Sequence, residues 1–287
     1  MRIRELGADS RQTAAVSEPA ARVVADSTSP SSTRLTTLEV QLHRFVLAEL
    51  NTHRVFSRNS ASSRAIPIAK QIERVLNDPA LPLEYGSKRA GMQAGPPLTG
   101  DALADAQQVW LAARDSAVAA AQELLRLGVH KQVANRLLEP FMWHTVIVSS
   151  TDWDGFWTQR CSPLAQPEIR VAAEAMRDAV HNSTPTALAA GEWHLPYITE
   201  DDRNDAGRDH ETLRRVSAAR CGRVSYLTQD GRRDLDEDLL LYDRFVTAYP
   251  PHASPLEHVA TPVPAQGGRQ LGNLRGWLQL RHLALAS

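Results

Sequence analysis

One polar segment of the sequence concentrates residue types that bind anions. Residues 51–64 contain three arginines, one histidine and four serines, and no acidic residue. An arginine side chain offers a fixed fork of N–H donors to phosphate, and serine hydroxyls with turn amides can supply the remaining contacts. The segment is therefore a candidate site for a phosphorylated ligand. The alternative is a solvated helix end whose cations complement the helix dipole, and composition alone leaves both open.

The spacing within this segment is more specific than its composition. His53 and Arg54 are followed by seven residues and then by Ser62. This pattern resembles the signature of the flavin-dependent thymidylate synthases, which is Arg-His-Arg, seven residues and serine. In that family the His-Arg pair contacts the flavin, while the serine end and a nearby arginine hold the nucleotide. The resemblance implies that His53 and Arg54 bind the cofactor, and that Ser62, Ser63 and Arg64 bind the substrate.

The signature departs from the family pattern at two positions. Thr52 stands where the first arginine is usual, which removes one expected flavin contact, and Ser60 stands where a glutamate is usual. The Thr-His-Arg form resembles a subgroup found among phage enzymes and among uridylate C5-methylases of nucleoside-antibiotic pathways. Glu49, three residues before Thr52, completes the set of residues that the resemblance assigns to the substrate.

Two further segments resemble parts of the same family. Residues 127–140 contain a Gly-Val step and an arginine four residues before a proline, which implies that Arg136 binds the nucleotide. Residues 156–160 and 165–170 resemble the Phe-Leu-Asn-Leu-Arg and Ala-Gln-x-Glu-Ile elements. The arginine there contacts the uracil and promotes reaction at C5, so the resemblance implies this catalytic role for Arg160. For either arginine alone, a surface ion pair would be the ordinary role.

Three motifs in the C-terminal part occur in an unusual place. They are Arg-Val-Ser-Tyr at 223–226, an acidic segment at 234–242 and His-Ala-Ser-Pro-Leu-Glu-His at 252–258. Similar motifs precede the signature in the family, whereas here they follow it in the same mutual order. The chain therefore resembles a circularly rearranged relative, which is tolerable when the ancestral termini lie close together at the surface. The resemblance makes Ser225 and Ser254 candidates for contact with the flavin phosphates.

The resemblance implies a reaction as well as a site. A one-carbon unit would pass from methylenetetrahydrofolate to C5 of a uracil nucleotide, with FAD as the cofactor and NADPH as the reductant. It also implies a homotetramer in which several subunits contribute to each active site. UMP or dUMP as substrate, and a methyl or hydroxymethyl group as product, remain open.

Two rival hypotheses come from other classes. Cys161 follows Arg160 directly, and an arginine neighbour can favour the nucleophilic thiolate, although no partner base is evident and a small buried cysteine is commoner. A non-catalytic nucleotide- or RNA-binding module would also use residues 51–64. Single-stranded nucleic-acid sites interleave cations with exposed aromatic rings, however, and Phe56 is the single aromatic residue of the segment.

Composition excludes several broad classes. The 287 residues include 32 basic and 33 acidic side chains, so no charge excess marks the chain for nucleic acid or a membrane surface. Two cysteines cannot form a disulfide framework, and the N-terminus has no hydrophobic signal-peptide core, which leaves the cytoplasm as the expected compartment. The sequence has no His-Glu-x-x-His, Cys-x-x-Cys, Walker loop or Gly-x-Gly-x-x-Gly, so we expect no metal site and no Rossmann fold.

The elements that must position these residues can be predicted from periodicity. A short strand is expected at 23–24, a turn at 29–32 and a half-buried strand over 38–42, where apolar and polar residues alternate. From Phe45 the period changes to that of a helix, which is predicted to end near Asn59. The strand therefore leads into a helix with a strongly polar end.

Helices dominate the rest of the chain. Asp101 is the expected N-cap of a long core helix that ends at Gly128, followed by a short helix over 131–138 and a buried strand over 141–148. Pro167 opens another helix.

The acidic residues 200–209 are expected to form an exposed loop or lid. The predicted fold is α+β, with helices packed on a small mixed or antiparallel sheet as in the flavin-dependent thymidylate synthases. We expect residues 1–20 to be a flexible extension and residues 21–287 to be one catalytic domain with rearranged motif order.

Overall fold

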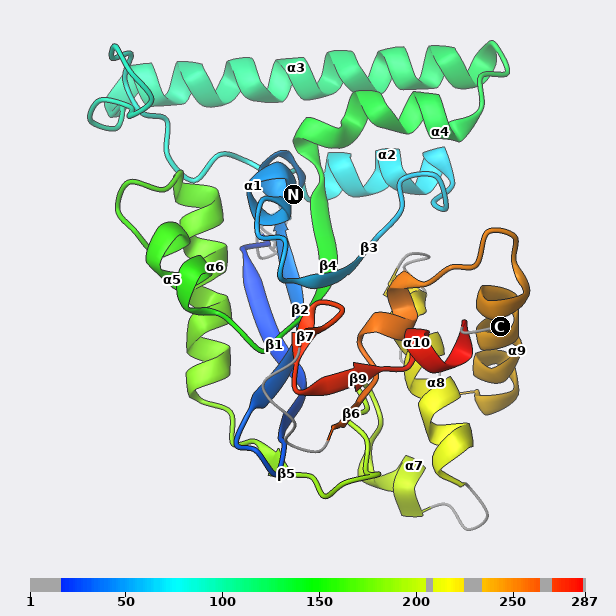
Figure 1. Ribbon diagram of the computed structural model, residues 1–287. Helices are drawn as coiled ribbons and strands as arrows, with labels where there is room; N and C mark the ends of the chain where they lie inside the picture. The colour runs from blue at the N-terminus through cyan, green and yellow to red at the C-terminus, as the bar shows by residue number, and fades with distance from the viewer. Residues whose placement is uncertain (1–16, 205–208, 225–233, 264–269, 286–287) are drawn as a thin grey trace, which may run out of the picture.

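The centre of the protein is a five-stranded sheet (Figure 1). The computed structural model describes residues 17–204, 209–224, 234–263 and 270–285. The strand order is β3-β4-β2-β1-β5; β5 runs parallel to β1 and the other neighbours are antiparallel. This arrangement confirms the predicted α+β class. The strands are β1 (Ala20–Thr28), β2 (Arg34–His43), β3 (Ser57–Ser60), β4 (Trp143–Ser150) and β5 (Thr186–Ala187).

One face of the sheet, called the first face here, is apolar. Leu38, Val40 and Leu42 alternate along β2, as the sequence predicted, and all three are fully buried. α5 (Asp154–Arg160) and α6 (Pro167–His181) cover this face, and α6 contributes Ile169 and Met176 to the same core. The helix predicted to open at Pro167 is confirmed.

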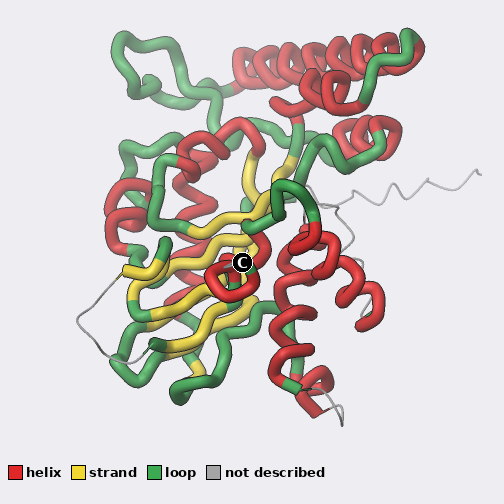
Figure 2. Tube along the Cα trace, turned by 45° about the vertical axis from the view of Figure 1, so that its right-hand side comes forward, coloured by secondary structure: helices red, strands yellow, loops and turns green. Residues whose placement is uncertain are grey.

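The opposite face, called the second face, is polar and is covered by the C-terminal part of the chain. A chain of hydrogen bonds crosses it from Ser27 through His194, Thr37 and Ser149 to His258, with donor–acceptor distances of 2.6–2.9 Å. Figure 2 shows the strands as one layer with the C-terminal helices beside it. Since buried polar groups need partners, this chain of bonds fixes the C-terminal segments to the sheet.

The remaining elements surround this arrangement. α3 lies across α2 and α4 at one end of the molecule, at the top of Figure 1. The helices not yet given are η1 (Arg44–Val46), α1 (Leu47–Asn51), α2 (Ile68–Asn77), α3 (Gly100–Arg126), α4 (Lys131–Ala134), η2 (Asn135–Phe141), α7 (Glu200–Asn204), α8 (His210–Arg223), α9 (Leu235–Thr247), η4 (Ser254–Glu257) and α10 (Arg281–Ala284). The further strands are β6 (Ala260–Pro262), β7 (Gln270–Leu271), β8 (Leu274–Arg275) and β9 (Trp277–Gln279).

Two predicted helices need correction. The helix expected to reach Asn59 ends at Asn51, because residues 57–60 pair with β4 as β3 instead. The long helix is present as α3, but it is not a core helix: Val118 and Ala121 are its buried residues. Its N-cap is Thr99 instead of the predicted Asp101, which lies in the first turn.

The acidic segment at 200–209 is not simply an exposed loop. Residues 200–204 form α7, and Asp202 is buried. Residues 205–208, like most of the predicted N-terminal extension, lie outside the described residues. No helix in the described ranges is both long and apolar enough to cross a membrane.

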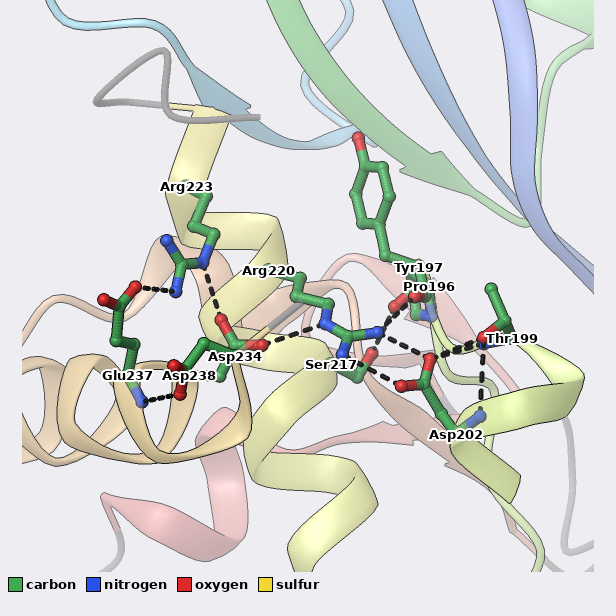
Figure 3. A network of polar contacts seen from close by, with 10 residues as sticks. All are labelled: Pro196, Tyr197, Thr199, Asp202, Ser217, Arg220, Arg223, Asp234, Glu237 and Asp238. Atoms are coloured by element: carbon green, nitrogen blue, oxygen red, sulfur yellow. Dashed lines mark hydrogen bonds and ion pairs between the residues drawn. The ribbon is translucent and has the colours of Figure 1, made fainter. Parts of the chain in front are cut away.

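Asp202 is buried because Arg220 pairs with it (Figure 3). The Arg220 guanidinium donates to both carboxylate oxygens of Asp202, at 2.6 and 3.0 Å, and to Asp238 at 3.0 Å. Burial alone would raise the pKa of Asp202, but hydrogen bonds from Arg220 and Thr199 hold it well below the ordinary value. The network joins α7, α8 and α9 and so fixes the C-terminal end of α8.

Replacement of Arg220 should therefore destabilise the protein strongly. Arg220→Met leaves two buried carboxylates without their common partner, and we expect the free energy of unfolding to fall by about 3–5 kcal/mol. Urea unfolding measures this change. Arg177→Met, which removes a surface ion pair, is the control and should change it by less than about 0.5 kcal/mol. Equal effects of the two substitutions would contradict the structural role of Arg220.

Stability should also fall in mild acid because of buried histidines. Burial lowers the pKa of His144, His194 and His258 to about 3, so all three fold in the neutral form. Their contribution is complete above the unfolded pKa of about 6.5 and is lost as the pH falls toward the folded pKa. Between pH 7.5 and pH 5.5 the free energy of unfolding should fall by about 1.4 kcal/mol per histidine. An unchanged urea midpoint at pH 5.5 would contradict this assignment.

Candidate active site

The Arg160 guanidinium is held by one short segment at the end of α1. Its Nε donates to Nε2 of His53 at 3.1 Å, and its Nη2 donates to the Thr52 hydroxyl at 2.9 Å and to the Glu49 carbonyl at 3.3 Å. We call these three acceptors the Arg160 cradle. The structure thus brings together Glu49, His53 and Arg160, which the sequence nominated from segments more than 100 residues apart.

The cradle fixes the protonation of His53. Because a guanidinium can only donate, Nε2 of His53 must accept, and the ring proton of the neutral imidazole sits on Nδ1. Burial, followed by the charges of Arg160 and Arg58, lowers the pKa of His53 below its ordinary value. Phe156 packs its edge against the ring, with centroids 4.8 Å apart. His53 is therefore an oriented neutral donor at Nδ1.

The two cations that act on His53, Arg160 and Arg58, are not paired directly with carboxylates. Neither forms an ion pair within the part of the chain that the structure describes, although the charge of Glu257 acts on Arg58. Burial lowers the pKa of Arg58, which is half-buried and reaches the Leu50 carbonyl at 3.4 Å. Uncompensated arginines store unfavourable electrostatic energy that a bound anion would relieve.

A second group of predicted residues lines a cavity of about 420 Å³. Ser62 and Arg64 lie on one side of it, and Ser254 and His252 lie on the other, delivered by the C-terminal part of the chain. Ser254 donates to the Asn59 side-chain oxygen at 3.1 Å. Hydroxyl and guanidinium donors in a cavity of this size fit a phosphate-containing ligand.

β3 separates the two groups. Successive side chains of a strand point to opposite faces. The positive charge of Arg58 lowers the pKa of His53, whereas Asn59 contacts the C-terminal part of the chain. Since β3 is the edge strand of the sheet, both groups lie beside the same edge. Asn59 is held by its amide donating to the Cys221 carbonyl at 2.7 Å.

The structure places the other predicted residues apart from these groups. Ser63 lines a separate cavity of about 480 Å³ between α2 and the sheet. The Arg136 side chain is half-exposed and pairs with Glu139 at 2.6 Å, and Arg54 is exposed. Ser225 lies outside the described residues.

Sequence reasoning missed several residues that shape the site. Asn135 is fully buried, and its amide donates to the Ser63 and Ile66 carbonyls at 2.6 and 3.0 Å, which fixes the segment after the signature. Gln132 lines the Ser254 cavity from the same helical region. Both residues lie in the helix predicted over residues 131–138, where the sequence assigned a role to Arg136 alone.

The thiol of Cys161 does not support the rival covalent mechanism. Burial raises the pKa of Cys161 above its ordinary value, so the thiol stays protonated near neutral pH. Its partly buried side chain packs against the first-face core. Among the described residues no group of three or more potential metal ligands occurs.

Comparison with known proteins identifies the family. The model of the family described as thymidylate synthase complementing protein matches residues 10–186. The chain belongs to this family. The match includes the Arg160 cradle and Ser62, whereas Ser254 and His252 come from beyond it.

Solved structures of the UMP/dUMP methylase PolB from Streptomyces cacaoi resemble this chain. The form bound with 5-Br dUMP is 17% identical, with a TM-score of 0.43, over 57% of this chain and 91% of that chain. The form bound with 5-Br UMP is 16% identical, with a TM-score of 0.47, over 57% of this chain and 89% of that chain. No curated protein sequence matches the chain.

The cradle predicts the titration of His53. We expect its pKa, followed by NMR of the ring protons, to lie below about 6.5 in the ligand-free protein. Arg160→Gln removes a positive charge beside the ring and should raise this pKa, while Arg177→Gln on the surface should not. A pKa above 6.5 in the unsubstituted protein, or no rise in Arg160→Gln, would contradict the geometry.

Proposed function

We propose that this protein catalyses flavin-dependent C5-methylation of a uracil nucleotide, UMP or dUMP. Methylenetetrahydrofolate is the one-carbon donor and NADPH the reductant. Family membership supports the general activity, since residues 10–186 match the thymidylate synthase complementing proteins. The arrangement of donors on Arg160 supports the role of that residue.

The observation that carries this proposal is the edge of Arg160 that remains available. The cradle occupies Nε and Nη2, and Nη1 has no partner among the described residues. Arginine binds phosphate in a bidentate way through two neighbouring nitrogens, either Nη1 and Nη2 or Nε and Nη2. In Arg160 each of these pairs contains at least one nitrogen that already donates to the protein. Each N–H group of Nη1 can donate one hydrogen bond, which suits a carbonyl oxygen. Arg160 would stabilise negative charge developing on a uracil carbonyl during reaction at C5.

The residues of the second cavity fit the polar part of FAD. Ser62, Arg64 and Ser254 supply hydroxyl and guanidinium donors for a diphosphate, and Ser225 is a further candidate from the sequence. His53 offers an N–H from its fixed Nδ1, and Arg54 an exposed guanidinium, so both would bind the flavin. When bound, FAD supplies the redox and one-carbon transfer chemistry. The protein binds and orients the two ligands and excludes water from them.

We also propose that the motif order is circularly rearranged. The His-Ala-Ser-Pro-Leu-Glu-His motif reaches the edge of the sheet in this structure, where Ser254 donates to Asn59, three residues before the signature serine Ser62. Through this contact, the motif at residues 252–258 lies next to the signature segment at residues 51–64. A homotetramer would bring the exposed Arg136 and Arg54 of one subunit toward the site of another, which is consistent with their position at the surface.

Product analysis tests the proposal directly. Purified protein should be yellow with a flavin absorbance spectrum, and should convert UMP or dUMP to the C5-methylated nucleotide only with FAD, NADPH and methylenetetrahydrofolate together. Mass spectrometry of the nucleotide distinguishes methyl from hydroxymethyl. A colourless protein that also fails to take up added FAD would instead favour a non-catalytic nucleotide-binding module.

Substitutions at the cradle should separate cofactor binding from turnover. Arg160→Ala should retain FAD, because the residues assigned to the cofactor are all still present, but lose turnover on the order of 100-fold or more. His53→Ala should impair flavin binding or flavin reduction. Arg177→Ala is the control and should retain both. Turnover of both variants at the level of the unsubstituted protein would refute the site assignment.

A further inference from the structure

We propose that Thr52 is a positioning residue that fixes the orientation of the Arg160 guanidinium toward the substrate. Thr52 is the position at which the signature departs from the family pattern, and the departure alone suggested only a lost flavin contact. The structure gives the threonine hydroxyl two bonds, one to the backbone and one to Arg160. The proposal rests on the proposed function of Arg160.

The direction of hydrogen bonding at Thr52 is fixed. Its hydroxyl donates to the Glu49 carbonyl at 2.7 Å, which uses its single proton. The lone pairs that remain accept from Arg160 Nη2 at 2.9 Å. Thr52 therefore presents only acceptor character to the guanidinium, and it does so from a side chain anchored to its own helix.

This contact decides how far Arg160 is immobilised. Nη2 donates to the Thr52 hydroxyl at 2.9 Å and, over a longer distance of 3.3 Å, to the Glu49 carbonyl. An arginine side chain near the surface loses considerable rotamer freedom when it is fixed. Without the hydroxyl, one edge of the guanidinium would be held by the Glu49 carbonyl alone.

The same contact sets the orientation of the free nitrogen of Arg160. Because Nε and Nη2 are both bonded to the cradle, Nη1 is the nitrogen that remains for a substrate acceptor. Loss of the Thr52 hydroxyl would let the guanidinium turn and would move Nη1 from this position.

Four variants test the proposal. Thr52→Val removes the hydroxyl at nearly constant shape, and Thr52→Ser retains it. Thr247 is the matched control position, because it is an exposed threonine at a helix end whose hydroxyl donates to the Asp243 carbonyl at 2.7 Å. Thr247→Val and Thr247→Ser therefore remove and retain an equivalent bond far from Arg160.

The first readout needs no catalysis. The charges acting on His53 come from Arg160 of α5 and Arg58 of β3, with Arg54 next to it in sequence. If Thr52 holds Arg160 in the cradle, Thr52→Val lets that charge move away and the NMR pKa of His53 rises. Thr52→Ser and both Thr247 variants should leave it unchanged. An equal pKa in Thr52→Val and Thr52→Ser would overturn the proposal.

The second readout is the kinetics of UMP or dUMP methylation. Loss of one hydrogen bond to a charged group should lower kcat of Thr52→Val about tenfold, with the affinity for FAD unchanged. Thr52→Ser should restore kcat to within about twofold of the unsubstituted protein. A loss of FAD affinity that matches the loss of kcat, or a similar loss in Thr247→Val, would also overturn it. If the unsubstituted protein makes no methylated product, the proposed function fails, while the His53 titration still decides the role of Thr52.

Discussion

The pairing of β3 with β4 determines where every functional side chain of residues 51–64 lies. Four residues of this segment join the edge of the sheet, so Arg58 and Asn59 must point to opposite faces. The residues before the strand turn toward α5 and meet Arg160. The residues after the strand border the cavity that contains Ser254. The side chains of residues 51–64 therefore form two separate groups of hydrogen-bond donors on either side of the edge strand β3.

The electrostatics of this edge differ from those of the rest of the protein. In the C-terminal part, the buried Arg220 is neutralised by two aspartates. Around β3 the guanidinium groups are held by carbonyl, hydroxyl and imidazole acceptors, which orient them without cancelling their charge. Protein stability alone would favour carboxylate partners there. Positively charged side chains that are held in place without carboxylate partners are the arrangement expected of a site that binds an anionic ligand.

Sequence patterns predicted the elements with strong periodicity and missed those defined by pairing. The alternation of Leu38, Val40 and Leu42 specified β2, and the helix opened by Pro167 was equally clear. β3 was missed because Ser-Arg-Asn-Ser has low strand propensity and becomes a strand only beside β4. Likewise, nothing local to Asp202 shows that it is buried, since its partner lies 18 residues away.

The same division holds for the site. Resemblance nominated His53 and Arg160 separately, but their contact depends on the packing of α5 against the end of α1. Thr52 was visible only as a departure from a pattern. Its two hydrogen bonds depend on the direction of the α1 backbone, which no spacing rule contains.

The chain of hydrogen bonds from Ser27 to His258 makes the C-terminal segments part of the same folding unit as the sheet. The family match stops at residue 186, yet the second face of the sheet up to that point presents Thr37, Ser149 and Asn59, which find their partners in later segments. A fragment cut at that boundary would lose the His194, Cys221 and His258 partners of these three polar side chains. The segments beyond residue 186 are thus as much a part of the folding unit as the strands they cover.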